Sequence, residues 1–194
     1  TDLYQDASGN PLGTTYLPPD PVSGEVLVDV LGIVPTSDHV LLYSEVDADL
    51  HDAVAAGTYG TGAIKSTIKS VPQYFLVNGD GFKPGDEITE PSPVITVRTA
   101  TQEGPVLLRL LNAGQDSRVP ILDRSELTLV AEDGQPYNHP KTKYSVFLPA
   151  LKTVDALWTP SEAGNYALYD RRFGLMNGSG VESVGGMLVQ LVIE

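Results

Sequence analysis

The sequence contains no cysteine among its 194 residues. Disulfides, thiolate nucleophiles and cysteine-based zinc sites are therefore excluded. The absence of cysteine does not by itself fix the cellular compartment, because both oxidising and reducing compartments hold proteins without cysteine.

Histidine is also scarce. The three histidines, His39, His51 and His139, are far apart in the sequence, and no two form a His-x-His pair. A blue-copper centre needs two histidines and a cysteine thiolate. A mononuclear site made of histidine alone would require all three to converge, and we expect solvent-facing or capping histidines instead. The sequence therefore predicts no metal, cofactor or catalytic site in this chain.

Positive charge and long apolar runs are the other shortages. There are 12 Lys and Arg against 25 Asp and Glu, which gives a formal net charge of −13. Such a surface repels phosphates, so we expect no nucleic-acid partner. No apolar run approaches the roughly 18 residues of a membrane span, and no signal peptide is visible at Thr1. We therefore expect no membrane partner.

Familiar catalytic motifs are absent as well. The sequence has no Gly-x-Ser-x-Gly, no phosphate-binding loop and no His-Glu-x-x-His. Two acidic clusters could in principle serve acid–base chemistry or hold calcium, although solvated surface is the usual role of such clusters. Their members are Asp123, Glu126, Glu132 and Asp133 in one, and Glu25, Glu45, Asp47, Asp49 and Asp52 in the other.

Two further acidic segments favour turns over sites. Asp133-Gly134 is a common tight-turn dipeptide between strands. Asp6, Ser8 and Asn10 faintly resemble a calcium loop. However, Pro11 stands where that loop needs glycine, and Leu17 stands where it needs a bidentate glutamate, so we expect a turn there.

What the sequence does contain is typical of an all-β protein. Its 15 Pro and 19 Gly separate short β-rich runs, which predicts a Greek-key β-sandwich. The one expected helix spans Asp47–Ala56, where Asp47 can cap the helix and Gly57 can end it. The expected strands are Glu25–Val30, His39–Ser44, Tyr74–Val77, Val94–Thr99, Val106–Leu111, Leu127–Ala131, Tyr144–Leu148, Thr153–Trp158, Tyr166–Asp170 and Met187–Ile193.

The chain divides into three expected parts. Residues 1–24 form an irregular N-terminal extension, because proline, glycine and turn residues dominate there. Residues 25–70 carry the first strands, the short helix and a Gly/Thr/Ser-rich linker. Residues 71–194 form the β-sandwich.

Several single residues have expected structural roles. Arg109 lies mid-strand between leucines and should point away from the core, toward a carboxylate or a domain contact. Tyr166 follows Gly164-Asn165 and resembles the tyrosine corner of Greek-key sandwiches. Trp158 is an expected core anchor. The last strand alternates, which predicts an inner face of Met187, Val189, Leu191 and Ile193.

From about Val40 to Glu194 the chain resembles the second, non-terminal cupredoxin domain of a three-domain multicopper oxidase. Seven short motifs carry this resemblance because they occur in the family's order. They are Leu41–Asp47 with Leu50-His51, Tyr74–Gly79, Leu108–Gly114, Ala131–Gly134, Val154–Pro160, Gly164–Tyr166 and Gly185–Met187.

The chain departs from the copper-bearing domains of that family at the copper ligands. After Gly-x-Tyr those domains carry a His-x-His pair, and here Tyr169 and Arg171 stand at the two histidine positions. Asp170 stands where those domains have serine or cysteine. Met187 begins the closing strand without cysteine or histidine ligands nearby in the sequence. The resemblance therefore implies a copper-free domain.

The resemblance also implies a role. It predicts a structural domain that spaces other cupredoxin domains of a secreted or periplasmic, laccase-like multicopper oxidase. That parent would oxidise a reducing substrate and reduce dioxygen to water, with copper in the sister domains, while this chain alone would not be catalytic. The alternative is a stand-alone β-sandwich binding or adhesion module whose acidic patches take a cation or a basic partner. A spacer domain further predicts weak self-association through the apolar run Phe173-Gly174-Leu175-Met176.

Overall fold

The structure is a computed structural model that describes residues 35, 37–82, 94–97, 104–172 and 186–193. The expected N-terminal extension, the strand at Glu25–Val30, the Asp6–Asn10 turn and the apolar run Phe173–Met176 lie outside the described residues. The described elements are β1 (Ser37–Val46), α1 (Ala48–Ala55), the 3-10 helix η1 (Thr67–Lys69), β2 (Tyr74–Val77), β3 (Val94–Val97), β4 (Val106–Asn112), β5 (Pro120–Leu122), β6 (Leu127–Glu132), β7 (Gln135–Lys143), β8 (Thr153–Trp158), β9 (Gly164–Asp170) and β10 (Leu188–Ile193).

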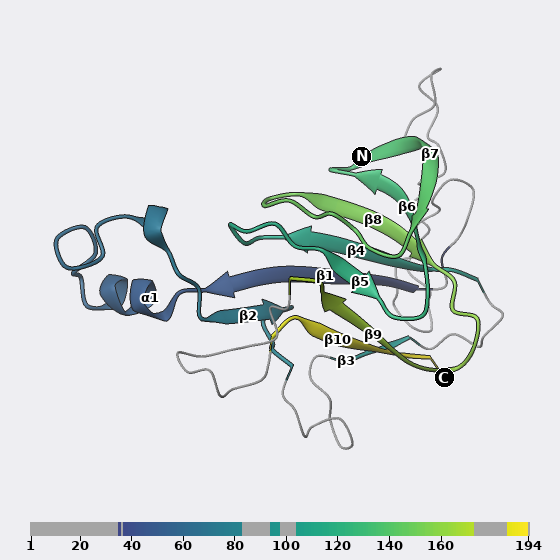
Figure 1. Cartoon of the computed structure of the whole chain (residues 1–194), viewed down its shortest axis with the longest axis horizontal. Coiled ribbons are helices and arrows are strands. Elements are labelled where there is room, and N and C mark those ends of the chain that lie inside the picture. Colours follow the sequence, from purple (N-terminus) through teal and green to yellow (C-terminus); the bar gives the residue numbers. More distant parts are fainter. Residues whose placement is uncertain (1–34, 36, 83–93, 98–103, 173–185, 194) are drawn as a thin grey trace, which may run out of the picture.

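Two sheets form the body of the molecule (Figure 1). The larger has six strands in the order β2-β1-β4-β8-β6-β7, and the smaller has four in the order β3-β10-β9-β5. Most neighbours are antiparallel, but β1 pairs with β4 in parallel and β10 pairs with β3 in parallel. The prediction of an all-β Greek-key sandwich with one short α-helix is thus confirmed.

The core lies between the two sheets because the strands alternate. In the last strand Val189, Leu191 and Ile193 are buried, together with Met187 just before it, while the residues between them are only partly buried. Inner residues of the larger sheet meet this face, among them Leu108 and Leu110 of β4. The predicted inner face of the closing strand is confirmed.

Trp158 and Tyr166 join the two sheets at one end of the core. The Trp158 ring is fully buried, and its Nε1 donates to Ser125 Oγ at 2.9 Å. Its ring meets the Tyr166 ring edge to face, with centroids 5.0 Å apart. The Tyr166 hydroxyl donates to the Glu162 carbonyl at 3.0 Å, which is the predicted tyrosine corner.

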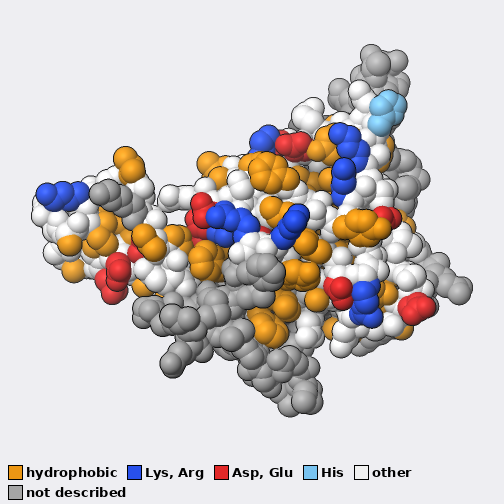
Figure 2. Space-filling view, in the orientation of Figure 1, with side chains coloured by type: hydrophobic (Ala, Val, Ile, Leu, Met, Phe, Trp, Pro, Cys, Tyr) orange, Lys and Arg blue, Asp and Glu red, His pale blue; other side chains and the backbone are white. Residues whose placement is uncertain are grey.

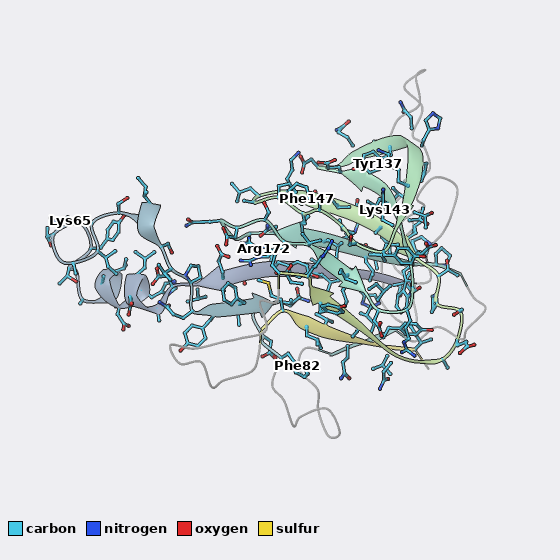
Figure 3. All side chains as sticks on the ribbon, viewed as in Figure 1. Lys65, Phe82, Tyr137, Lys143, Phe147 and Arg172 are labelled. Atoms are coloured by element: carbon cyan, nitrogen blue, oxygen red, sulfur yellow. The ribbon has the colours of Figure 1, made fainter. Side chains whose placement is uncertain are left out.

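The short helix begins where the sequence predicts. Asp47 caps α1, and its Oδ1 accepts from the Leu50 amide at 3.0 Å. Its Oδ2 accepts from the Val71 amide at 2.9 Å, so one carboxylate holds both ends of the segment between β1 and β2. No residue of α1 is buried. The helix and η1 project beyond the end of the sheets (Figure 1), and Lys65 marks the tip of this projection (Figure 3).

The hairpin of β6 and β7 contains a turn that the sequence predicts and a strand that it does not. Asp133 and Gly134 both have positive φ, as a two-residue type I′ turn requires. The strand β7 follows directly, although the sequence pattern predicts the next strand at Tyr144–Leu148. That expectation is wrong, because only Ser145 and Leu148 form isolated bridges there.

No helix in the described part of the chain is long and apolar enough to cross a membrane.

Candidate functional site

The structure places the three histidines on separate elements. His39 lies on β1, where its Nε2 is 3.0 Å from Ser37 Oγ. His51 is exposed on α1, and His139 is exposed on β7, at the opposite edge of the six-stranded sheet from the β2–β1 edge. They do not converge. Within the described ranges, no group of three or more His, Asp or Glu residues is arranged to hold a metal ion.

The acidic clusters also separate into structural pairs. Lys152 forms ion pairs with Asp133 and with Glu132, and its Nζ lies 3.4 Å from Glu132 Oε1. These two carboxylates therefore fix the β6–β7 hairpin to the start of β8. Asp123 pairs with the neighbouring Arg124. Asp47 is the helix cap described above. Glu25 lies outside the described residues.

Arg109 behaves as the sequence predicts. It lies on the outer side of β4, with its Nε 2.9 Å from Asp38 Oδ2 and its Nη1 3.7 Å from Asp155 Oδ2. These partners belong to the neighbouring strands β1 and β8. The three side chains form a charged row across the outer face of the larger sheet.

The strongest concentration of buried charge lies elsewhere, around Arg118. Arg118 is only 3% exposed, although it is charged. Its guanidinium bonds through Nη2 to Glu45 Oε2 and lies 3.7 Å from Asp170 Oδ2 through Nη1. Its Cζ lies 5.2 Å from the centre of the Phe75 ring, which is within the range of a cation–π contact. We call Tyr43, Glu45, Arg118 and Asp170 the Arg118 network.

The backbone positions this network rigidly. Arg118 exchanges two backbone hydrogen bonds with Leu148, of 2.8 and 2.9 Å, just before β5 begins. Asp170 ends β9 and is fully buried, and its Oδ1 accepts from the Val119 amide at 2.8 Å and the Arg172 amide at 3.3 Å. Figure 3 shows Arg172 near the middle of the molecule, close to the end of β9.

The network links the two sheets. Glu45 lies on β1 of the six-stranded sheet, whereas Asp170 lies on β9 of the four-stranded sheet. Glu45 is held in turn, because its Oε1 accepts from the Gln115 amide at 2.7 Å. One guanidinium therefore contacts a carboxylate from each sheet.

Burial governs the electrostatics of this network. Burial lowers the pKa of the Arg118 guanidinium, and the Asp170 carboxylate opposes that shift. Burial also raises the pKa of the Tyr43 hydroxyl, with a second contribution from the charge of Asp170. Tyr43 therefore stays neutral at physiological pH, and Arg118 stays charged because a guanidinium does not deprotonate in proteins.

These residues do not suit a copper ion. The resemblance places Tyr169 and Arg171 at the two histidine positions and Asp170 at the serine or cysteine position between them. Arg171 is exposed, and Tyr169 points to the opposite side of β9 from Asp170. Asp170 already binds two backbone amides and faces a guanidinium. A copper cation beside Arg118 would meet like charge, so this group of side chains disfavours copper.

Sequence reasoning missed Arg118 and Glu45 as partners. The only local signal is a charge placed directly before the apolar run Val119–Leu122. Glu45 stands 73 residues before Arg118, and Asp170 stands 52 residues after it. A single sequence has no periodicity that connects such distant positions.

Two adjoining hollows lie on the projection formed by α1 and η1. One has a volume of about 470 Å³ and the other about 490 Å³, and Leu50 and Thr67 line both. Leu50, Val54 and Tyr59 give the second hollow a mainly apolar wall, with His51 at its side. The titratable side chains in the walls are Asp47 and Lys65 in the first hollow and His51 and Tyr59 in the second.

Several solved structures with a similar fold are copper oxidases. A blue copper oxidase from Nitrosomonas europaea has a TM-score of 0.64 and 18% identity, covering 82% of this chain and 44% of that one. The multicopper oxidase mgLAC has a TM-score of 0.64 and 17% identity, with the same coverage. Fet3p, a multicopper oxidase that functions in iron import, has a TM-score of 0.57 and 15% identity, covering 81% of this chain and 28% of that one.

These likenesses establish a cupredoxin-like fold for the chain, which spans less than half the length of each of these three proteins. No curated protein matches the sequence significantly. The sequence model of the family described as multicopper oxidase matches residues 38–185, which is most of the chain. The chain therefore belongs to the multicopper oxidase family.

Proposed function

We propose that this chain is a copper-free, structural cupredoxin domain of a multicopper oxidase. The observation that carries the proposal is the Arg118 network. At Asp170, which stands between the two histidine positions of the copper-bearing domains, a buried guanidinium joins carboxylates from both sheets. The positive charge that links the two sheets is therefore the guanidinium of Arg118.

We further propose that the chain works as part of a longer protein. It spans 44% of the first two similar structures, so proteins of this family have room for further domains. In the proposed parent, other cupredoxin domains hold the copper and pack against this one. The parent is a secreted or periplasmic enzyme that oxidises a reducing substrate and reduces dioxygen to water.

Elemental analysis of the purified chain tests the copper-free part of the proposal. After incubation with Cu²⁺ and gel filtration, we expect no stoichiometric copper and no blue charge-transfer band, because Tyr169–Arg171 supply neither the histidine pair nor the thiolate of a blue-copper centre. A variant with His51→Gln and His139→Gln is the matched control, since it removes the two exposed histidines that could bind copper loosely. One tightly held copper per chain that survives in this variant would overturn the proposal.

The parent is tested at the level of the gene. We expect the reading frame that encodes this chain to encode His-x-His and His-Cys-His segments as well. A frame that ends on both sides of this chain without such segments would contradict the spacer role. It would favour the stand-alone binding module instead.

A further inference from the structure

Three buried polar atoms of the Arg118 network have no hydrogen-bond partner among the residues that the structure describes. They are the Tyr43 hydroxyl, Arg118 Nε and Asp170 Oδ2. Tyr43 and Asp170 are fully buried, and Arg118 is 3% exposed. A buried polar group without a partner is costly, so native proteins rarely keep three of them together.

The three atoms belong to residues that are connected with one another in the core. Asp170 Oδ2 lies 3.7 Å from Arg118 Nη1, too far for a hydrogen bond but close enough for an ion pair. Tyr43 stands two residues before Glu45 on β1, so both side chains point into the sandwich, and Glu45 bonds the same guanidinium. The negative charge of Asp170 also contributes to the raised pKa of the Tyr43 hydroxyl.

We propose that one internal water molecule binds among these residues and bridges Tyr43 Oη, Arg118 Nε and Asp170 Oδ2. The inference goes beyond the proposed function and does not depend on it. The mixture of groups selects the ligand. A carboxylate disfavours an anion, a guanidinium disfavours a metal cation, and a small neutral molecule that both donates and accepts remains.

Water satisfies all three atoms at once. Its oxygen accepts from the Arg118 Nε–H and from the Tyr43 O–H, and one of its hydrogens is donated to Asp170 Oδ2. Buried waters typically make about three such bonds to otherwise unsatisfied groups. The water thereby completes a polar link from β1 through Arg118 to β9, across the two sheets.

The substitution Tyr43→Phe tests the site by the sign of its effect on the melting temperature. It keeps the ring and removes only the hydroxyl. If that hydroxyl donates to a bound water, we expect melting to fall by about 2–4 °C. If the hydroxyl has no partner, its removal relieves a desolvation cost and melting rises. Tyr166→Phe is the matched control, because its hydroxyl has a known acceptor at 3.0 Å and its loss should lower melting.

A crystal structure of the unmutated chain tests the site directly. We expect one water within hydrogen-bond distance of all three atoms, and in Tyr43→Phe a water that keeps only two of these bonds. Direct contact of Tyr43 with Asp170 in place of a water would overturn the proposal. So would an ion at this site, or a rise in the melting temperature of Tyr43→Phe.

Discussion

Tyr166 shows how a single hydroxyl anchors a strand. It bonds the Glu162 carbonyl and so fixes the turn that leads into β9. Loss of such a hydrogen bond in Tyr166→Phe should cost about 1–3 kcal/mol. Because Glu162 lies in an exposed turn, water can take over its carbonyl, and we expect the lower end of that range. Urea unfolding of the variant measures this difference, and an unchanged midpoint would contradict the anchoring role.

Trp158 is the largest fully buried side chain of the core. Trp158→Ala should lower the free energy of unfolding by about 3–5 kcal/mol, because it removes the ring and leaves a cavity. It also leaves Ser125 Oγ without its donor. Trp158→Phe is the matched control, since it keeps most of the apolar contact and should cost clearly less. Equal costs for the two variants would show that the hydrogen bond, and not packing, decides stability here.

Residue roles were predictable from sequence where a local pattern defines them. Gly-Asn-Tyr marked Tyr166, and alternation marked the inner residues of β10. Arg109 was expected to meet a carboxylate, but which one depends on strand order, and the structure supplies Asp38 and Asp155. Arg118 was not predicted, because burial of a charge can be recognised only when its distant partners are known.

The β6–β7 hairpin should respond to pH through one ion pair. The hydrogen bond that Lys152 donates to Asp133 lowers the pKa of the Asp133 carboxyl and raises the pKa of the Lys152 ammonium. A carboxyl with a lowered pKa stabilises the fold above its ordinary value of about 3.9, and that stabilisation is lost as the pH falls through the lowered pKa. An ammonium with a raised pKa stabilises below about 10.4, and the contribution disappears as the pH rises through the raised pKa.

Hydrogen exchange of the Thr153 amide measures this pair, because that amide donates to Asp133 Oδ1 at 3.0 Å. We expect a high protection factor for the Thr153 amide between these two pH limits and a lower protection factor beyond either limit. Asp133→Asn is the control, since Asn-Gly also forms a type I′ turn but carries no charge. Its exchange should lose the acid-side transition while the hairpin remains. If the variant retains that transition, another group is responsible for it.

Strand prediction failed at the level of elements for physical reasons. The strand β7 contains Pro136 and Pro140, which argue against a central strand, but β7 is an edge strand that pairs only with β6. The segment Tyr144–Leu148 alternates correctly, with Val146 and Leu148 buried and Phe147 exposed. Its backbone nevertheless meets the β5 region only through isolated bridges. Periodicity shows which side chains face inward but not whether a regular ladder forms.

At the scale of the whole molecule, the spacer role predicts weak self-association of the isolated chain. Apolar surface that sister domains cover in the parent would be open here. We expect Phe173→Ser with Leu175→Ser to reduce association in sedimentation experiments, and these positions lie outside the described residues. The matched control is Phe147→Ser with Leu151→Ser, because both are described as exposed, at 67% and 82%.

The control pair should leave association unchanged. Figure 2 shows hydrophobic side chains at several places on one face, interleaved with Lys and Arg, so exposure alone does not single out an interface. A monomer at high concentration for the unmutated chain would count against the spacer role. If only the control pair reduces self-association, the interface includes the surface around Phe147 and not the Phe173 run.

The sequence predicted the sandwich as a whole better than its connections. Turn spacing and alternation were sufficient for two antiparallel sheets with a short helix. They could not reveal the two parallel pairings, because these join segments that share no turn. Ser37 pairs with Val106, and Gln190 pairs with Val94.

These pairings have a consequence for the order of folding. The strand β10 lies between β3 and β9, so the smaller sheet cannot close until Leu188–Ile193 are available. During synthesis β3 and β9 would each expose an unpaired edge until β10, their shared neighbour, is made. Contacts between such distant segments slow folding, because a long loop must close before they form. A nascent chain that ends at Met187 should therefore need protection from chaperones, although it already contains nine of the ten described strands.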